Sequence, residues 1–281
     1  MATLLFQCQT ANRYRINFEL FKCFPDYISF FESVSDLSLD ETDFKEGMGQ
    51  KYYEYNQSLT FLMNHLFYLK WKKENPKKKI DFLCGHSLGE YNALVVAESL
   101  DFETALDLII NRNEEMNRIK DGHMMVALGL DRDELNHVLE TAHLNEETYL
   151  SVCNNTKYHC ISYVDSKKTE VLKTLRKHGC HVLSIPFFGP YHSPLMKAAE
   201  WEYGWALDEV TFKTPKITVI SNYKAIPYVK QDARMNLYNH ITKPVQWDKS
   251  MSLLKSCGET EFIEMGKNKV LLRQMGVDGR A

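Results

Sequence analysis

The sequence predicts an α/β protein with a central, mostly parallel sheet flanked by helices, into which a smaller β-α-β-β-α-β unit is inserted. Two observations carry this prediction. An apolar segment, residues 80–84 (IDFLC), runs into a Gly-x-Ser-x-Gly turn and then into an apolar-periodic segment, a pattern typical of strand, turn and helix in an α/β sheet. Within residues 124–187, strand-like and charged helical segments follow one another in the order of a ferredoxin-like split unit.

The elements before the turn are predicted from their apolar spacing. Residues Leu4–Phe6 are a short apolar strand candidate, and a helical segment follows around Phe18–Ser33. Residues 52–72 are predicted to form a long helix, because apolar side chains recur there at helical spacing (Leu59, Leu62, Met63, Leu66 and Leu69). The loop ENPKKK separates this helix from the strand candidate at 80–84, which is suited to the middle of a parallel sheet.

Two helices are predicted after the turn. The first carries the apolar residues Leu88, Leu94, Val95 and Leu100. The second spans roughly Phe102–Ile119, with Asp101 as its N-cap. The inserted unit then follows, and its predicted elements are, in order, strand 124–130, helix 131–142, strands 149–155 and 159–165, helix 167–178 and strand 181–187.

Two further strands are predicted beyond the insertion, KITVISN (216–222) and TEFIEMG (260–266), with a helical stretch around 246–256 between them. We therefore expect two subdomains. Residues 1–123 and 188–281 form the large α/β subdomain, and residues 124–187 form the small one.

Composition excludes several classes of function. The 281 residues carry a net charge of -3, which provides no global field for nucleic acid or an anionic membrane. No apolar run approaches the ~18 residues of a membrane span, and the N-terminus has no basic region of the kind that opens a signal peptide. The seven cysteines are scattered without a CxxC pair, which predicts free thiols, no metal site and a cytoplasmic protein. We expect a monomer without a bound cofactor.

Ser87 is the candidate nucleophile. It lies in Gly85-His86-Ser87-Leu88-Gly89, which fits the Gly-x-Ser-x-Gly elbow, where the tight turn requires glycine two positions away on either side. At this position Ser87 would sit at the positive end of a helix, with the N–H of Leu88 directed to where an oxyanion forms. A structural turn that happens to contain a serine is the alternative interpretation.

The segment around Ser87 resembles the malonyl-CoA:acyl carrier protein transacylase family. The similarity is greatest to the discrete, trans-acting acyltransferases of modular polyketide synthases. It extends over essentially the whole chain through segments in the same order, GHSLGEYNAL (85–94), FFGPYHSPLM (187–196), VISN…IPY (219–228), ITKPVQW (241–247) and FIEMGKNKVL (262–271). The resemblance implies a hydrolase-like core with the small ferredoxin-like subdomain beside it.

Three histidines are assigned roles through this resemblance. His192, in a Gly/Pro-containing loop, corresponds to the base that takes the proton of Ser87 and later returns it. The family carries glutamine where this chain has His240, and its backbone carbonyl orients the catalytic histidine, so we expect the His240 carbonyl to do the same. His86 is interpreted as a wall of the pocket and not as the base. Its neighbour in the sequence is Ser87, and the side chains of adjacent residues point in different directions at an elbow.

Arg112 is the candidate ligand of a substrate carboxylate. It follows Ile109 by three positions and precedes Met116 by four, which places it on the apolar stripe of its helix. A guanidinium facing inward requires an anion. An internal salt bridge or an outward-reaching side chain is the alternative. The resemblance matches Arg112 to the arginine that holds the free carboxylate of malonyl-CoA in a bidentate pair.

The oxyanion site departs from the family pattern. The resemblance implies a second backbone donor at Gln9, beside that of Leu88, but the family's flanking glycines are replaced by Cys8 and Thr10. Asn154 corresponds to an asparagine of the small subdomain near the acyl pocket.

We expect a malonyl transfer from malonyl-CoA through a Ser87 acyl-enzyme to the phosphopantetheine thiol of an acyl carrier protein, in polyketide or fatty acid biosynthesis. Two alternatives remain open, a hydrolase of the same fold that clears acyl groups from carrier proteins, and an inactive scaffold that only docks onto a synthase. Malonyl and methylmalonyl units are also not distinguished, because Gly189-Pro190-Tyr191-His192 matches neither typical motif.

Overall fold

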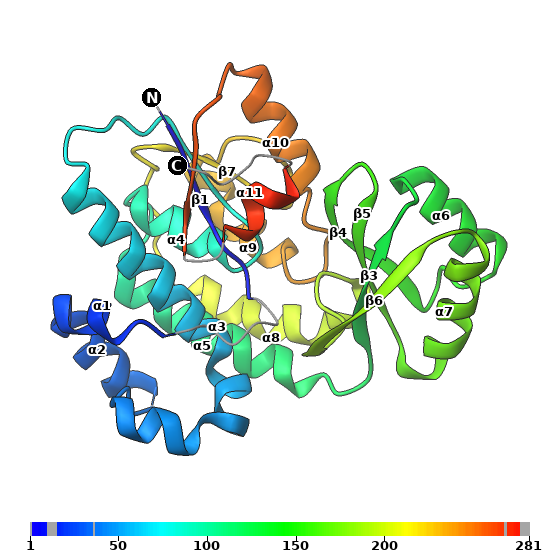
Figure 1. Cartoon of the computed structure of the whole chain (residues 1–281), viewed down its shortest axis with the longest axis horizontal. Coiled ribbons are helices and arrows are strands. Elements are labelled where there is room, and N and C mark those ends of the chain that lie inside the picture. The colour runs from blue at the N-terminus through cyan, green and yellow to red at the C-terminus, as the bar shows by residue number, and fades with distance from the viewer. Residues whose placement is uncertain (1, 10–15, 36, 267–268, 276–281) are drawn as a thin grey trace.

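The computed structural model describes residues 2–9, 16–35, 37–266 and 269–275. For residues 42–54 and 186–188 it describes the backbone alone. It contains two sheets, each with its own helices, which lie side by side along the long axis of the molecule (Figure 1). The predicted fold class is confirmed: one sheet is parallel and flanked by helices, and the other belongs to the inserted unit.

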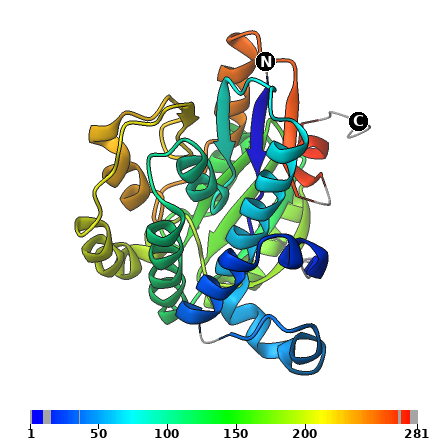
Figure 2. The ribbon, with the colours of Figure 1, turned by 90° about the vertical axis from the view of Figure 1, so that its left-hand side faces the viewer.

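The parallel sheet has the strand order β7-β2-β1-β8. Its strands are β1 (Thr3–Phe6), β2 (Phe82–Gly85), β7 (Thr218–Ile220) and β8 (Phe262–Met265). Figure 2 shows β1 between β2 and β8. All four residues of β1 are buried, as a strand covered on both faces must be. Because Phe6 pairs with Gly85, the segments that follow β1 and β2 leave the same edge of the sheet.

The N-terminal helices differ in extent from the prediction. The single helix expected at Phe18–Ser33 is two, α1 (Phe18–Cys23) and α2 (Pro25–Ser35), because Pro25 lacks an N–H and disfavours helical backbone at the residue before it. The helix expected at 52–72 is longer, and α3 runs over Glu41–Glu74. After Ser87, α4 (Gly89–Val96) is shorter than the predicted helix, since Leu88 lies at its N-cap and Leu100 lies beyond its end. The second predicted helix is α5 (Phe102–Arg118), and the side chain of Asp101 caps it by accepting from the N–H of Thr104 at 2.7 Å.

The second sheet is antiparallel, with the order β4-β5-β3-β6. Its elements follow one another as predicted, β3 (His123–Leu128), α6 (Arg132–Thr141), β4 (Thr148–Asn155), β5 (Tyr158–Tyr163), α7 (Lys168–Lys177) and β6 (His181–Phe188). Leu135, Leu139 and Leu175 belong to a hydrophobic cluster separate from the main core. This separate core supports the division into subdomains at 123/124 and 187/188, which stays a prediction.

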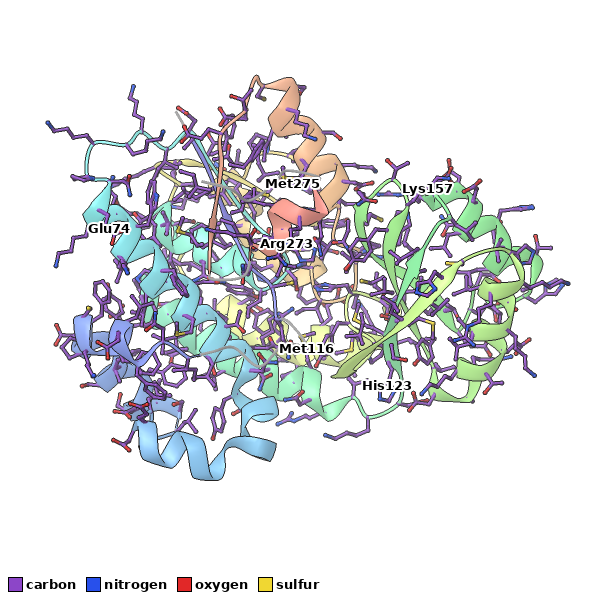
Figure 3. All side chains as sticks on the ribbon, viewed as in Figure 1. Glu74, Met116, His123, Lys157, Arg273 and Met275 are labelled. Atoms are coloured by element: carbon purple, nitrogen blue, oxygen red, sulfur yellow. The ribbon has the colours of Figure 1, made fainter. Side chains whose placement is uncertain are left out.

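Four later helices complete the fold, α8 (Lys197–Asp208), α9 (Ala233–Asn239), α10 (Trp247–Ser256) and α11 (Val270–Gln274). Only α10 was predicted. The antiparallel sheet and its helix α6 contact the segment at the start of α10, where the N–H of Cys153 donates to the carbonyl of Val245 at 2.9 Å and Arg132 pairs with Asp248 at 3.1 Å. Glu74, at the end of α3, and Lys157, at the β4–β5 hairpin, lie on opposite sides of the molecule (Figure 3). Among the described residues, no helix is both long and apolar enough to cross a membrane.

Candidate active site

Ser87 occupies a strained turn between β2 and α4. Its φ of 50° lies in the left-handed region, which a serine rarely adopts. A Cβ atom on Gly85 would lie 1.9 Å from the carbonyl carbon of Gly89, and one on Gly89 would lie 2.3 Å from the carbonyl oxygen of Phe6. Both positions therefore exclude any side chain. This is the local geometry that the Gly-x-Ser-x-Gly spacing predicts, and it projects the serine from the carboxyl edge of the parallel sheet.

His192 lies against Ser87. Its Nε2 is 2.7 Å from the Oγ of Ser87, and its Nδ1 is 2.7 Å from the backbone carbonyl of His240. Because a carbonyl only accepts, Nδ1 carries the proton and Nε2 is free to accept the proton of the hydroxyl. The structure thus brings together three residues singled out from the sequence, in an arrangement suited to activating the serine.

His192 is 3 % exposed, and its environment opposes protonation. Burial, followed by the positive charge of Arg112, lowers the pKa of His192 from 6.5 to about 3. The neutral form, which is the only one that can act as a base, is therefore present at any pH above that value.

This shift predicts an acylation rate that resists mild acid. An unperturbed histidine with a pKa of 6.5 would be only about 3 % neutral at pH 5. Since the pKa of His192 is lowered, we expect kcat/KM for acylation of Ser87 to fall by no more than about 10-fold between pH 8 and pH 5. A stopped-flow pH series checks this, and a 30-fold loss centred near pH 6.5 would contradict it.

Arg112 is buried, and its hydrogen-bond partner is an amide. Its side chain is 2 % exposed, and its Nη1 donates to the Oε1 of Gln57 on α3. Its Nε has no hydrogen-bond partner, and no ion pair links Arg112 to an acidic residue in the part of the chain that the structure describes. A buried guanidinium in this state calls for an external anion. The positive charge of Arg112 lowers the pKa of both His192 and Glu90.

Three backbone N–H groups of the turn already donate hydrogen bonds within the protein. The N–H groups of His86 and Gly89 bind the carbonyls of Phe6 and His86, and that of Ser87 binds the Oδ1 of Asn222 at 2.7 Å. The N–H of Leu88 has no partner among the described residues. A free N–H next to the nucleophile, at the start of α4, is what an oxyanion requires.

The second predicted donor, Gln9, lies three residues beyond Phe6, at the edge from which Ser87 projects. The structure gives no contact between Gln9 and Ser87. The rest of the N-terminal segment compared with the family, residues 10–12, lies outside the described residues.

His86 and Asn154 form the contact between the elbow and the small subdomain. The Nε2 of His86 is 2.8 Å from the Oδ1 of Asn154 on β4, and the His86 ring packs 5.1 Å from that of Trp247. Burial lowers the pKa of His86 to about 4, so the ring is neutral. The role of His86 as a wall of the pocket stays a prediction.

Asn222 and Glu90 are site residues that sequence analysis missed. The Oδ1 of Asn222 accepts from the N–H of Ser87 at 2.7 Å, and its Nδ2 donates to the carbonyl of Gly85 at 2.5 Å. Its own N–H donates to the Oε1 of Glu90 at 3.0 Å. Asn222 lies in the segment VISN, which follows β7, and its position in a segment shared with the family was the only signal in the sequence.

Replacing Asn222 with alanine removes both side-chain contacts to the elbow. It leaves a buried donor and a buried acceptor unpaired, at a cost of about 1–3 kcal/mol each. We expect the free energy of unfolding to fall by about 2–4 kcal/mol and the acylation rate by about 10-fold. Denaturant unfolding and single-turnover acylation measure the two effects. Asn236→Ala is the control, because Asn236 is equally buried but its Oδ1 has no partner; a similar loss of acylation in both variants would contradict this role.

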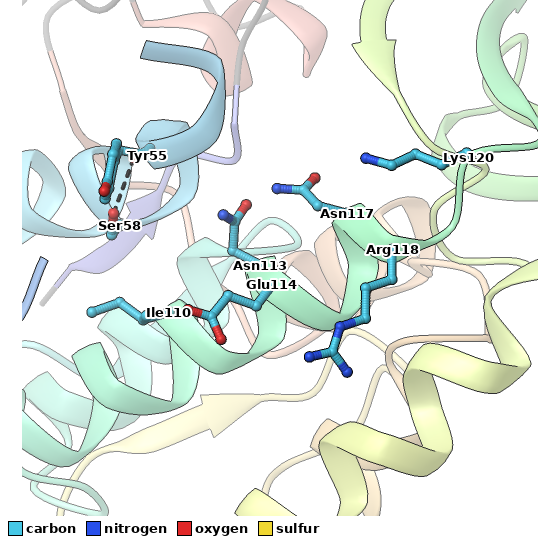
Figure 4. A pocket seen from close by; sticks show the side chains of 8 residues that line it. All are labelled: Tyr55, Ser58, Ile110, Asn113, Glu114, Asn117, Arg118 and Lys120. Atoms are coloured by element: carbon cyan, nitrogen blue, oxygen red, sulfur yellow. Dashed lines mark hydrogen bonds between the residues drawn. The ribbon is translucent and has the colours of Figure 1, made fainter. Parts of the chain in front are cut away.

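A cavity of about 420 Å³ lies between residues of α3 and α5. Figure 4 shows Tyr55 and Ser58 of α3 across from polar side chains of α5. The cavity is lined by Tyr55, Ser58, Ile110, Asn113, Glu114, Asn117, Arg118 and Lys120.

No group of three or more His, Cys, Asp or Glu side chains within the described ranges is placed to hold a metal ion.

Comparison with known proteins identifies relatives over most of the chain. Residues 71–278 match the family described as "Acyl transferase domain". The polyketide biosynthesis malonyl CoA-acyl carrier protein transacylase PksC of Bacillus subtilis is 35% identical over 78% of this chain and 76% of its own length. The corresponding protein BaeC of Bacillus velezensis is 29% identical over 96% of this chain and 94% of its own.

A solved structure agrees with these relatives. The crystal structure of a malonyl CoA-acyl carrier protein transacylase from Burkholderia pseudomallei superposes with a TM-score of 0.90 and 28% identity, covering 99% of this chain and 97% of that one. The similarity therefore includes both sheets and the elements that carry Ser87, Arg112 and His192.

Proposed function

The chain belongs to the acyl transferase domain family, and from this premise we propose that it moves a malonyl group from malonyl-CoA to the phosphopantetheine thiol of an acyl carrier protein. The observation that carries the proposal is the combination of an activated serine with a buried arginine that has no carboxylate partner among the described residues. The first feature suits acyl transfer in general, and the second suits an acyl group that itself bears a carboxylate. Relatives named as malonyl CoA-acyl carrier protein transacylases support both the donor and the acceptor.

The reaction proceeds in two half-reactions. The Oγ of Ser87 attacks the thioester carbonyl while His192 Nε2 takes its proton. The C–S bond then breaks, and His192 returns the proton to the CoA thiolate. In the second half-reaction the carrier thiol gives its proton to His192 and attacks the acyl-enzyme; the bond to Ser87 then breaks, and the Oγ of Ser87 takes that proton back from His192. The N–H groups of Leu88 and Gln9 stabilise the oxyanion in both steps.

Arg112 holds the malonyl carboxylate throughout. Because its charge is one cause of the low pKa of His192, an anion bound to Arg112 offsets that effect. We therefore expect the substrate carboxylate to make His192 a stronger base at the moment when the proton of Ser87 must leave. Uncharged acyl groups do not provide this gain.

The test is transfer to a carrier. The protein is incubated with malonyl-CoA and an acyl carrier protein from a polyketide synthase bearing phosphopantetheine, and intact-protein mass spectrometry follows malonyl-carrier formation. We expect malonyl transfer that greatly exceeds release of free malonate. Faster release of free acid than of malonyl-carrier, with acetyl preferred over malonyl, would overturn the proposal in favour of a hydrolase. Stable carrier binding without any acyl transfer would indicate a scaffold.

A further inference from the structure

A buried carboxylate lies behind the catalytic pair. Glu90, the second residue of α4, is 1 % exposed. Its Oε1 accepts from the N–H of Asn222 at 3.0 Å and from the hydroxyl of Tyr228 at 2.7 Å. Through Asn222, which in turn binds the N–H of Ser87, this oxygen supports the nucleophile elbow.

The other oxygen of Glu90 faces the imidazole of His240. Its Oε2 lies 3.1 Å from the Nδ1 of His240. The angles at this contact are outside those of a hydrogen bond, so neither atom has a hydrogen-bond partner in the described part of the chain. Two buried polar atoms that lack partners and lie within reach of each other form a pair after a small rotation of either side chain. In either charge state of Glu90, one proton can lie between them.

His240 connects this carboxylate to His192. Its backbone carbonyl accepts from the Nδ1 of His192 at 2.7 Å, and its imidazole stacks on the ring of His192 with centroids 4.7 Å apart and planes at 26°. His240 is fully buried. The backbone contact depends on no side chain, whereas the stacked ring and its contact with Glu90 do.

We propose that Glu90 is a positioning residue for both members of the catalytic pair, through Asn222 for Ser87 and through the imidazole of His240 for His192, and that its negative charge stabilises the imidazolium of His192 in the transition state. The inference rests on the proposed function only in taking Ser87 and His192 as the reacting pair. The proton that leaves Ser87 stays on His192 Nε2 until the leaving group takes it, and Glu90 acts on that charge without exchanging a proton with it.

The charge of Glu90 is set by the groups around it. They are Cys84 on β2, Tyr91 on α4, Arg112 on α5, Tyr203 on α8, Tyr228 after β7, and His240 with its neighbours His192 and His86. Burial raises the pKa of the thiol and of the three phenols, and lowers that of the three imidazoles, so these groups remain neutral around pH 7. Arg112 is always charged.

Glu90 is thus the member of this cluster whose charge changes near neutral pH. Burial raises its pKa to about 7, against the lowering effects of Asn222, Tyr228 and Arg112. Above pH 7 the carboxylate is anionic and counters the charge of Arg112 at His192. Below pH 7 it is neutral, and a glutamine in its place would differ little in charge or shape.

The test compares the wild-type protein with Glu90→Gln between pH 5.5 and 8.5. Labelling of Ser87 by a fluorophosphonate probe is the first readout, because it depends on activation of Ser87 and not on the acyl donor: an O–P bond forms, fluoride leaves and His192 takes the proton. Ser87 acylation by malonyl-CoA is the second. We expect similar labelling rates at pH 5.5 and a wild-type advantage of about 10-fold at pH 8.5, the size of one pKa unit.

Two further variants separate positioning from a general structural effect. His240→Gln, which installs the residue typical of the family, keeps the backbone carbonyl but removes the imidazole. We expect the effect of Glu90→Gln to shrink in that background, because the two residues act through one contact. Glu115→Gln, at another buried glutamate whose partner Arg118 lies on the same helix, should leave the pH dependence of the rate unchanged.

The two readouts distinguish the possible failures. A ratio of wild-type to Glu90→Gln labelling that is constant over pH, or effects of Glu90→Gln and His240→Gln that simply add, would overturn the positioning role. Labelling that follows the predicted ratio while malonyl-CoA fails to acylate Ser87 would support the positioning role and contradict the proposed function instead.

Discussion

Replacing His192 with asparagine is expected to reduce the rate constant for acylation of Ser87 by about 10²- to 10⁴-fold, the usual contribution of a positioned general base. The Nε2 of His192 is 2.7 Å from the serine oxygen, and no other described base contacts it. Asparagine is the informative substitution because His192 has a φ of 56°, a conformation that asparagine tolerates better than alanine does. Single-turnover acylation by malonyl-CoA measures the effect.

The control for this variant is His178→Asn, at an exposed histidine at the end of α7. We expect that substitution to leave the acylation rate unchanged. The melting temperature of each variant shows whether a lost rate reflects chemistry or unfolding. A His192→Asn protein that folds normally and keeps more than about a tenth of the wild-type rate would show that another group takes the serine proton.

Replacing Arg112 with glutamine is expected to lower kcat/KM for malonyl-CoA by at least about 10²-fold, because the carboxylate loses two charge-assisted hydrogen bonds worth about 1.5–3 kcal/mol each. Acetyl-CoA has no carboxylate, so its kcat/KM should change little. The ratio of the two specificity constants is therefore the quantity to measure. Arg112→Lys should fall between, since an ammonium keeps the charge but cannot form the bidentate pair.

The same substitution gives a stability result that an internal salt bridge would not. Arg112 has no ion-pair partner among the described residues, and the neighbouring Glu90 is neutral below pH 7, so below that pH the removal of Arg112 relieves an uncompensated charge; there we expect Arg112→Gln to be at least as stable as the wild type. Arg118→Gln is the matched control, because Arg118 lies on the same helix but is largely exposed and paired with Glu115. An unchanged ratio of malonyl to acetyl activity in Arg112→Gln would contradict the carboxylate role.

The elbow could be predicted from the sequence because its cause is local. Glycine is required at position 85 because a side chain there would clash with the backbone of Gly89, and at position 89 because it would clash with Phe6 on the adjacent strand. The Gly-x-Ser-x-Gly spacing reflects both requirements. The order of elements in the small subdomain was predictable for a similar reason, since each strand and helix carries its own apolar period. The break at Pro25 is local as well, but it depends on the effect of proline on the preceding residue, which apolar spacing does not show.

The support behind the catalytic pair could not be predicted in this way. Ser87 and Asn222 are 135 residues apart in the chain, and Glu90 and Tyr228 are 138 apart. Such contacts depend on how β2 and β7 pair in the sheet, which no local pattern encodes. The pairing of Ser87 with His192 is equally long-range, and it was predicted only through resemblance to a family.

The most direct measurement of the central claim is mass spectrometry of the acyl-enzyme after exposure to a panel of malonyl-, methylmalonyl- and acetyl-CoA. If Ser87 is the nucleophile of a malonyl transferase, the peptide containing Ser87 gains one malonyl group and the Ser87→Ala protein gains none. We also expect acetyl-CoA to label far less than malonyl-CoA does. Absence of label after exposure to malonyl-CoA, or label that persists in Ser87→Ala, would contradict that claim.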